Sequence, residues 1–161
     1  MPYKQLSEEM KQKDRDFAVK LLPIINSHVS DRYLNTWECV KRLVTDYKKH
    51  NSLFIAFDFD NTVFDYFGTG ETYPKLEALL QFLKVKGFKL ILFTGNEGEK
   101  LQEIVKYCKE HGYEPDFVNE SPVMKTTKPY YNILLDDRAG LNDAYQTLVL
   151  TLNILNYDYK Y

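Results

Sequence analysis

The sequence predicts an α/β fold built on a parallel β-sheet, in one domain. Short apolar runs alternate with segments whose apolar residues recur at helical spacing, which is typical of strands joined by crossover helices. Three of these runs also end in polar residues able to do chemistry, and such residues gather at the carboxyl edge of a parallel sheet. A chain of 161 residues is most simply one domain and is long enough to bury a core.

The first 50 residues are predicted to form a helical extension to a core that spans residues 51–161. One helix is expected over Ser7–Leu22, where Ser7 can cap the first turn and Pro23 ends the helix. A second is expected over Asn35–His50, with Trp37 among the apolar residues on one face. The two helices are expected to form a hairpin packed on the domain.

The core begins with a buried strand over Leu53–Phe57 and a glycine-containing loop over residues 64–73. Helices are then expected from Tyr73-Pro74 to Lys86, over Glu99–His111 and over roughly Leu141–Leu155, with glycines closing the first two. Further strands are expected over Phe88–Phe93, Phe117–Val118 and Tyr131–Leu135, with an irregular segment over Ser121–Pro129.

Asp58 and Asp60 follow the first strand, in the stretch Asp-Phe-Asp-Asn-Thr. Two carboxylates this close repel each other, and a divalent cation such as Mg²⁺ relieves that repulsion. One carboxylate can attack phosphorus, and the other can protonate the leaving oxygen and then activate water. Taken alone, the pair is better explained as aspartates that cap a turn, so the chemical interpretation depends on the rest of the chain.

Composition limits the classes of partner. The formal net charge of −2 shows no basic excess of the kind that marks nucleic-acid binding, although a local patch stays open. Cys39 and Cys108 lie far apart without metal-type spacing, so free thiols in a reducing compartment are expected. No apolar stretch reaches the length of a signal core or membrane span, so a cytoplasmic protein without membrane contact is expected. A homo-oligomer remains open.

The ordered set Asp58-Phe-Asp60-Asn-Thr62, Thr94-Gly-Asn, a lysine and Asp136-Asp137 resembles the four motifs of the haloacid dehalogenase (HAD) superfamily of phosphotransferases. The resemblance covers about Leu53 to Leu155 and leaves the first 50 residues outside it. It implies a three-layer, Rossmann-like parallel sheet. The acidic residue at position 60 favours a phosphatase over the dehalogenases and the ion-pumping ATPases of the superfamily.

The resemblance implies a role for each motif residue. Asp58 would be the nucleophile, and Asp60 the general acid and base, with its backbone carbonyl on Mg²⁺. Thr94 and the Gly95 N–H would bind the phosphate, with Asn96 nearby. Asp136 would bind Mg²⁺, and Asp137 would support the metal site directly or through water. The lysine would neutralise the phosphate and hold Asp58.

The identity of that lysine stays open between Lys125 and Lys128, with Lys128 preferred because rigid Pro129 and the next strand would fix its position. Thr94 has the alternative of capping a turn, and Asp136-Asp137 of capping the last helix. Arg138 is equally compatible with a substrate contact and with a surface ion pair.

Two positions depart from the common pattern. Asn61 replaces the usual glycine, and Asn96 stands where many relatives carry arginine or a similar polar residue. The stretches from Asp58 to Thr94 and from Thr94 to Lys128 are filled by core elements, so no large cap domain is expected. An open site suits a bulky phosphate or a small one covered by a partner subunit.

The sequence therefore predicts a Mg²⁺-dependent phosphomonoesterase that forms an aspartyl-phosphate at Asp58. Its substrate would be a nucleotide, a nucleic-acid end, a sugar phosphate or a phosphoprotein. The alternative is a non-catalytic binding or regulatory protein on a HAD scaffold, acting through the N-terminal helices.

Overall fold

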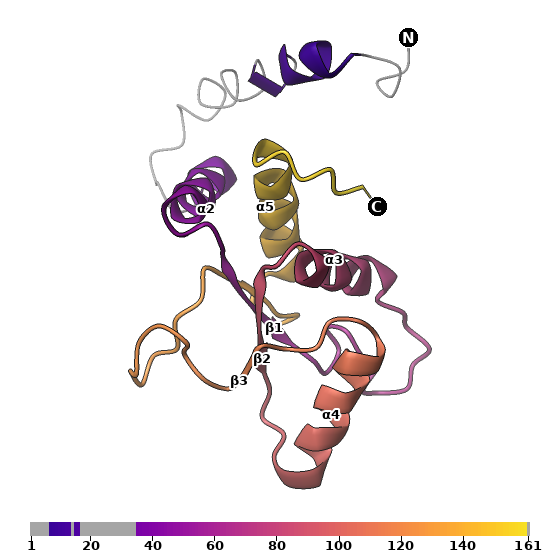
Figure 1. The fold of residues 1–161 in the computed structure, drawn as a ribbon. Coiled ribbons are helices and arrows are strands. Elements are labelled where there is room, and N and C mark those ends of the chain that lie inside the picture. Colours follow the sequence, from indigo (N-terminus) through magenta and orange to yellow (C-terminus); the bar gives the residue numbers. More distant parts are fainter. Residues whose placement is uncertain (1–6, 14, 17–34, 161) are drawn as a thin grey trace.

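The computed structural model describes residues 7–13, 15–16 and 35–160 (Figure 1). Within them lie four strands and four helices with defined bounds. In chain order these are α2 (Thr36–His50), β1 (Phe54–Asp58), α3 (Pro74–Val85), β2 (Lys89–Phe93), α4 (Gly98–Glu110), β3 (Phe117–Val118), β4 (Ile133–Leu135) and α5 (Leu141–Ile154). The bounds lie within two residues of those predicted from the sequence.

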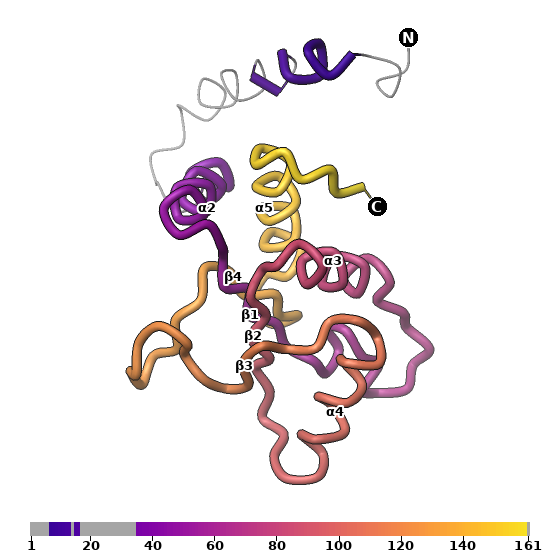
Figure 2. Tube along the Cα trace, viewed as in Figure 1, coloured from indigo at the N-terminus to yellow at the C-terminus, as the bar shows by residue number. Residues whose placement is uncertain are grey.

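The sheet has the order β3-β2-β1-β4, and every pairing in it is parallel (Figure 2). The predicted α/β class with a parallel sheet is therefore confirmed, and the arrangement is compatible with a Rossmann-like fold. β1 is a central strand because it pairs with β2 on one side and with β4 on the other.

The main core lies on one face of the sheet. Alternate strand residues such as Ile55, Phe57 and Leu92 are completely buried there, against apolar side chains from all four helices. The intervening residues point to the opposite face, where the ring of Phe54 meets Tyr130 at 6.1 Å and Phe93 meets Tyr131 at 5.7 Å between centroids. Burial on both faces explains why the strands are apolar runs without polar alternation.

Local signals set the ends of the second predicted helix as expected. The Asn35 side chain accepts a hydrogen bond from the Trp37 N–H, which caps α2. Asn51, at φ 54°, ends the helix in the left-handed conformation, and cationic residues occupy its last turn. α2 packs beside α5, and the hydroxyl group of Tyr47 on α2 lies 2.5 Å from that of Tyr157, three residues after the end of α5.

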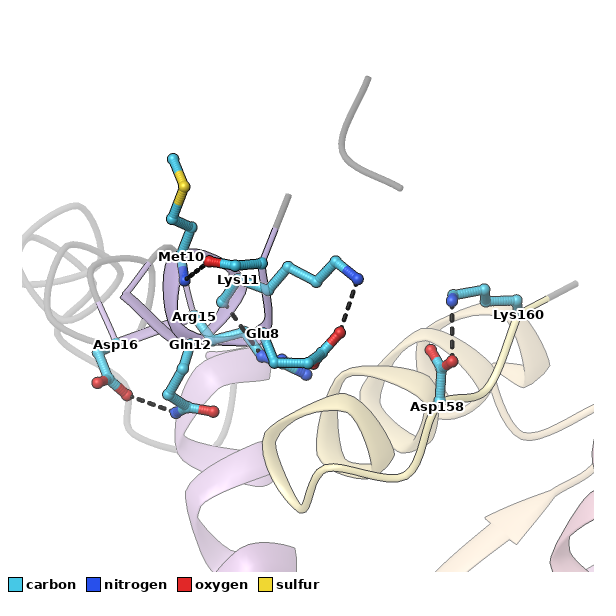
Figure 3. A network of polar contacts seen from close by, with 9 residues as sticks. Glu8, Met10, Lys11, Gln12, Arg15, Asp16, Asp158 and Lys160 are labelled. Carbon is cyan, nitrogen blue, oxygen red and sulfur yellow. Dashed lines mark hydrogen bonds and ion pairs between the residues drawn. The ribbon is translucent and has the colours of Figure 1, made fainter. Parts of the chain in front are cut away.

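Of the first predicted helix, residues 8–13 and 15–16 are helical, and the rest of Ser7–Leu22 lies outside the described residues. The Ser7 hydroxyl accepts from the Met10 N–H, as expected for a cap. Figure 3 shows Lys11 paired with Glu8 on this helix, and Lys160 paired with Asp158 on the C-terminal tail. All of these charges are at the surface, where such pairs add little stability.

Cys39 and Cys108 are free, as predicted, and burial raises the pKa of the Cys108 thiol to about 12. None of the described helices combines the length and the apolar character needed to cross a membrane.

Candidate functional site

The register of the sheet brings the predicted motifs to one edge. In the pairing of β1 with β2, Asp58 lies opposite Phe93, so Thr94 follows directly beside it. In the pairing of β1 with β4, Phe57 lies opposite Leu135, so Asp136 also follows at the same level. Three motifs that are distant in sequence are thus placed side by side because three parallel strands end together.

Asp58, Asp136 and Asp137 form an acidic cluster. One carboxylate oxygen from each residue lies within 4.8 Å of the others. No cationic side chain of the described residues forms an ion pair with any of the three. Such a concentration of negative charge is unfavourable unless a cation or protons compensate it.

Thr62 connects the members of this cluster. Its hydroxyl oxygen lies 3.2 Å from Asp58 Oδ2 and 3.4 Å from Asp137 Oδ1, and it accepts a hydrogen bond of 3.1 Å from the Asp137 N–H. Since a hydroxyl carries one proton, it donates to one carboxylate at a time. Thr62 is completely buried, so it holds the end of β1 against the end of β4 without competition from water.

The pKa of Asp58 is raised to about 6. The main cause is partial burial of the carboxyl group, which disfavours its charged form. Hydrogen bonds from the Phe59 N–H and from Thr62 lower the pKa in part, whereas the negative charges of Asp136 and Asp137 raise it further. The cluster fits a hard divalent cation such as Mg²⁺, because such cations prefer oxygen ligands. Asp58, Asp136 and Asp137 are the residues whose side chains would hold it.

Asp60 lies outside the cluster and has a different partner. Its Oδ2 accepts a hydrogen bond of 3.0 Å from the Asn96 amide, which also donates to the Thr94 hydroxyl at 2.9 Å. The other oxygen, Oδ1, is buried and has no hydrogen-bond partner among the described residues. Asn61 makes this geometry available, since at φ 59° it turns the chain sharply between the end of the strand and Thr62.

Thr94 is held in a fixed loop. Its N–H donates to the Asn119 side-chain oxygen at 2.9 Å, and its carbonyl accepts from the Asn119 amide at 2.8 Å. The Thr94 hydroxyl accepts from both the backbone N–H and the side chain of Asn96, so its own proton is left to donate. The adjacent Gly95 is exposed and has open space where a Cβ would stand.

The structure does not bring the predicted lysine to the carboxylates. Lys125 and Lys128 are both exposed in the segment between β3 and β4, and neither side chain pairs with Asp58. The preference for Lys128 therefore stays a prediction. Arg138 is also exposed, and it lines the cavity at the acidic cluster rather than forming an ion pair with a described residue.

That cavity has a volume of about 300 Å³. Its walls combine the predicted acidic residues with Asn61, Arg138 and the aromatic side chains of Tyr66 and Phe67. A larger cavity of about 670 Å³ lies between the N-terminal ends of α3 and α5, but it contains none of the carboxylates of the acidic cluster. The smaller cavity is the candidate active site because the three carboxylates of the acidic cluster line it.

Four residues of the site were not assigned a role from the sequence. Thr62 belongs to the first motif, and its position four residues after Asp58 is the available signal. Asn119 follows the two-residue strand β3, where a polar residue beyond a strand end gives only a weak signal. Tyr66 and Phe67 lie in the loop after β1, and nothing in the pattern separates them from ordinary loop aromatics.

No family model matches this chain, and no curated protein matches it significantly. Among solved structures, it is similar to a conserved protein of Bacteroides thetaiotaomicron, at 26% sequence identity and a TM-score of 0.51. The match covers 68% of this chain and 94% of that protein. The description of that protein names no activity, so the similarity concerns the α/β fold.

Proposed function

We propose that this protein is a Mg²⁺-dependent phosphomonoesterase of the HAD type without a large cap domain. The three layers implied by the resemblance are not proposed, because the four described helices all pack on one face of the sheet. The observation that carries the proposal is the meeting of Asp58, the Thr94 loop and the Asp136-Asp137 pair at one edge of the sheet. A turn-capping role explains any one of these groups, but it does not explain why all three meet at one edge of the sheet.

In the proposed reaction, a carboxylate oxygen of Asp58 attacks phosphorus as the bond from phosphorus to the leaving oxygen breaks. Asp60 gives its proton to that oxygen. Asp60 then takes a proton from water, which attacks phosphorus and breaks the bond to Asp58. Free phosphate leaves, and both aspartates return to their starting states.

The other residues position these two carboxylates and the phosphate. Asn96 holds Asp60 through the 3.0 Å hydrogen bond, which fixes the orientation of the acid in the wall of the cavity. The free proton of the Thr94 hydroxyl and the Gly95 N–H are donors for phosphate oxygens, and Lys128 would add a positive charge. Bound Mg²⁺ would neutralise the acidic cluster and polarise the phosphoryl group.

The test is release of p-nitrophenol from p-nitrophenyl phosphate in Mg²⁺ and in EDTA. Turnover should require Mg²⁺ and should fall by at least about 10³-fold in Asp58→Asn. Glu120→Gln is the control, because Glu120 is exposed and makes no ion pair with a described residue. Full activity of Asp58→Asn, or activity that is unchanged in EDTA, would refute the proposal.

A further inference from the structure

Two aromatic side chains are exposed at the mouth of the candidate active site. Tyr66 is 57% exposed and Phe67 is 71% exposed, although most aromatic side chains of the described core are packed. Their rings meet edge to face with centroids 5.5 Å apart. Both line the same cavity as Asp58 and Asp60.

The loop that carries these rings is held by its own hydrogen bonds. Both carboxylate oxygens of Asp65 accept from the loop: Oδ1 from the Thr69 N–H and hydroxyl at 3.1 and 3.2 Å, and Oδ2 from the Gly70 N–H at 2.7 Å. The Gly68 N–H also donates to the Asp65 carbonyl. The two rings are therefore presented to solvent by a fixed turn.

The cavity has an acidic part, formed by the carboxylates, and an aromatic part, formed by Tyr66 and Phe67. The acidic cluster suits a phosphoryl group with its cation, so the part of the substrate beyond the phosphate is expected to lie against the rest of the cavity wall. That wall is formed by Tyr66 and Phe67, with Arg138 among its neighbours. Exposed aromatic faces bind planar rings by stacking, and nucleobases are the planar rings commonly attached to phosphomonoesters.

We propose that Tyr66 and Phe67 form an aromatic platform that binds the base of a nucleoside monophosphate. This inference rests on the proposed phosphatase function and assigns it a substrate class. A free nucleotide is favoured over the end of a nucleic-acid strand for two reasons. The cavity of about 300 Å³ is at the small end of ligand pockets, roughly 300–1,000 Å³. The formal net charge of −2 offers no excess of cations for further phosphates.

The test compares substrates that differ only in the base. Wild type should hydrolyse adenosine 5′-monophosphate with a kcat/KM at least about tenfold above that for ribose 5-phosphate, because stacking one base is worth about that factor or more. Phe67→Ala should reduce this ratio by about tenfold, mainly through KM, and Phe67→Trp should restore it. Phe67→Leu keeps an apolar side chain without a ring and should resemble Phe67→Ala.

Val85→Ala is the matched control, because Val85 is 80% exposed at the end of α3 and is not one of the residues that line the cavity. It should leave the ratio at the wild-type value. Equal kcat/KM for the two substrates, or a ratio unaffected by Phe67→Ala, would overturn the platform and leave the phosphatase proposal standing. A preference for a 5′-phosphorylated oligonucleotide over the mononucleotide would overturn the assignment to free nucleotides.

A binding measurement separates failure of the platform from failure of the enzyme. Asp58→Asn protein in Mg²⁺ is titrated calorimetrically with adenosine 5′-monophosphate and with ribose 5-phosphate, with and without Phe67→Ala. Tighter binding of the nucleotide that Phe67→Ala abolishes would support the platform even if no substrate is hydrolysed. Equal affinities for the two ligands would overturn it.

Discussion

Asp58→Asn should make the metal-free protein more stable at neutral pH while it abolishes activity. The substitution keeps the shape of the side chain, and its amide oxygen can still accept from the Phe59 N–H and from Thr62. What it removes is a negative charge that burial and two neighbouring aspartates make unfavourable in the folded state. The folded state therefore carries an electrostatic cost at Asp58, which a bound divalent cation would relieve.

The size of this effect follows from the pKa of Asp58, which rises from 3.8 to about 6 on folding. A rise of about 2 pH units corresponds to at most about 3 kcal/mol of destabilisation when the carboxyl is ionised in both states. Asp58 is half-buried, so screening by solvent reduces the expected gain to about 1–2 kcal/mol. For a domain of this size, that gain raises Tm by about 2–8 °C.

The raised pKa of Asp58 also determines how the stability difference between Asp58→Asn and wild type changes with pH. A carboxyl with a raised folded-state pKa carries no penalty below about pH 4, where it is protonated in both states. The penalty grows as pH rises through the range between 3.8 and about 6 and is complete above it. The stability advantage of Asp58→Asn should therefore be largest at pH 7.5 and should disappear near pH 4.

Urea unfolding of wild type, Asp58→Asn and the Glu120→Gln control, in EDTA at several pH values, measures this difference directly. Added Mg²⁺ should stabilise wild type more than Asp58→Asn, because binding to the folded state shifts the unfolding equilibrium. The reasoning would be refuted if Asp58→Asn were less stable than wild type in EDTA at pH 7.5. A stability difference that stays constant from pH 4 to pH 7.5 would refute it equally.

Three further predictions concern individual residues of the site. Asn96→Ala removes the hydrogen-bond donor to Asp60 and should lower kcat by about 10–100-fold in steady-state kinetics. The affinity for Mg²⁺, measured by calorimetry, should not fall. An unchanged kcat would contradict the role of Asn96 in positioning Asp60. Thr62→Val removes the hydroxyl shared by two carboxylates and should weaken Mg²⁺ binding about 10–100-fold in a calorimetric titration. A Thr62→Val variant that binds Mg²⁺ as tightly as wild type would show that the hydroxyl does not organise the cluster. Lys128→Ala should reduce kcat/KM much more than Lys125→Ala. Because both side chains are exposed, neither change should alter the free energy of unfolding by more than about 0.5 kcal/mol. A larger loss of kcat/KM in Lys125→Ala would assign the phosphate-binding role to Lys125.

The sheet and the position of the carboxylates were predictable because both depend on local patterns. A run such as Leu53–Phe57 is too short and too apolar for anything but a buried strand in this context, and the polar residues after it mark the carboxyl end. Once strands are parallel, their ends share an edge, so Asp58, Thr94 and Asp136 had to approach one another. The register of strand pairing, with Asp58 opposite Phe93 and Phe57 opposite Leu135, then determines which residues lie at the same level at that edge.

Other parts of the site depend on contacts that no local pattern encodes. Thr62 acts through a hydrogen bond to Asp137, which is 75 residues away in sequence. Asn119 serves the site by holding the backbone of Thr94, and a side chain in that role needs no special neighbours in sequence. The prediction that Asn96 binds substrate remains untested, but its amide is directed to Asp60.

Isolation of the phosphorylated protein tests the central claim, that Asp58 is the nucleophile, most directly. Asp60→Asn should slow hydrolysis of the aspartyl-phosphate, whereas p-nitrophenol leaves readily without an acid, so the intermediate should accumulate. After an acid quench in Mg²⁺ and p-nitrophenyl phosphate, mass spectrometry should find one phosphoryl group on the peptide that contains Asp58, and none when Asp58 is also changed to asparagine. A phosphoryl group on another residue, or turnover by wild type through a protein that never becomes phosphorylated, would contradict the account.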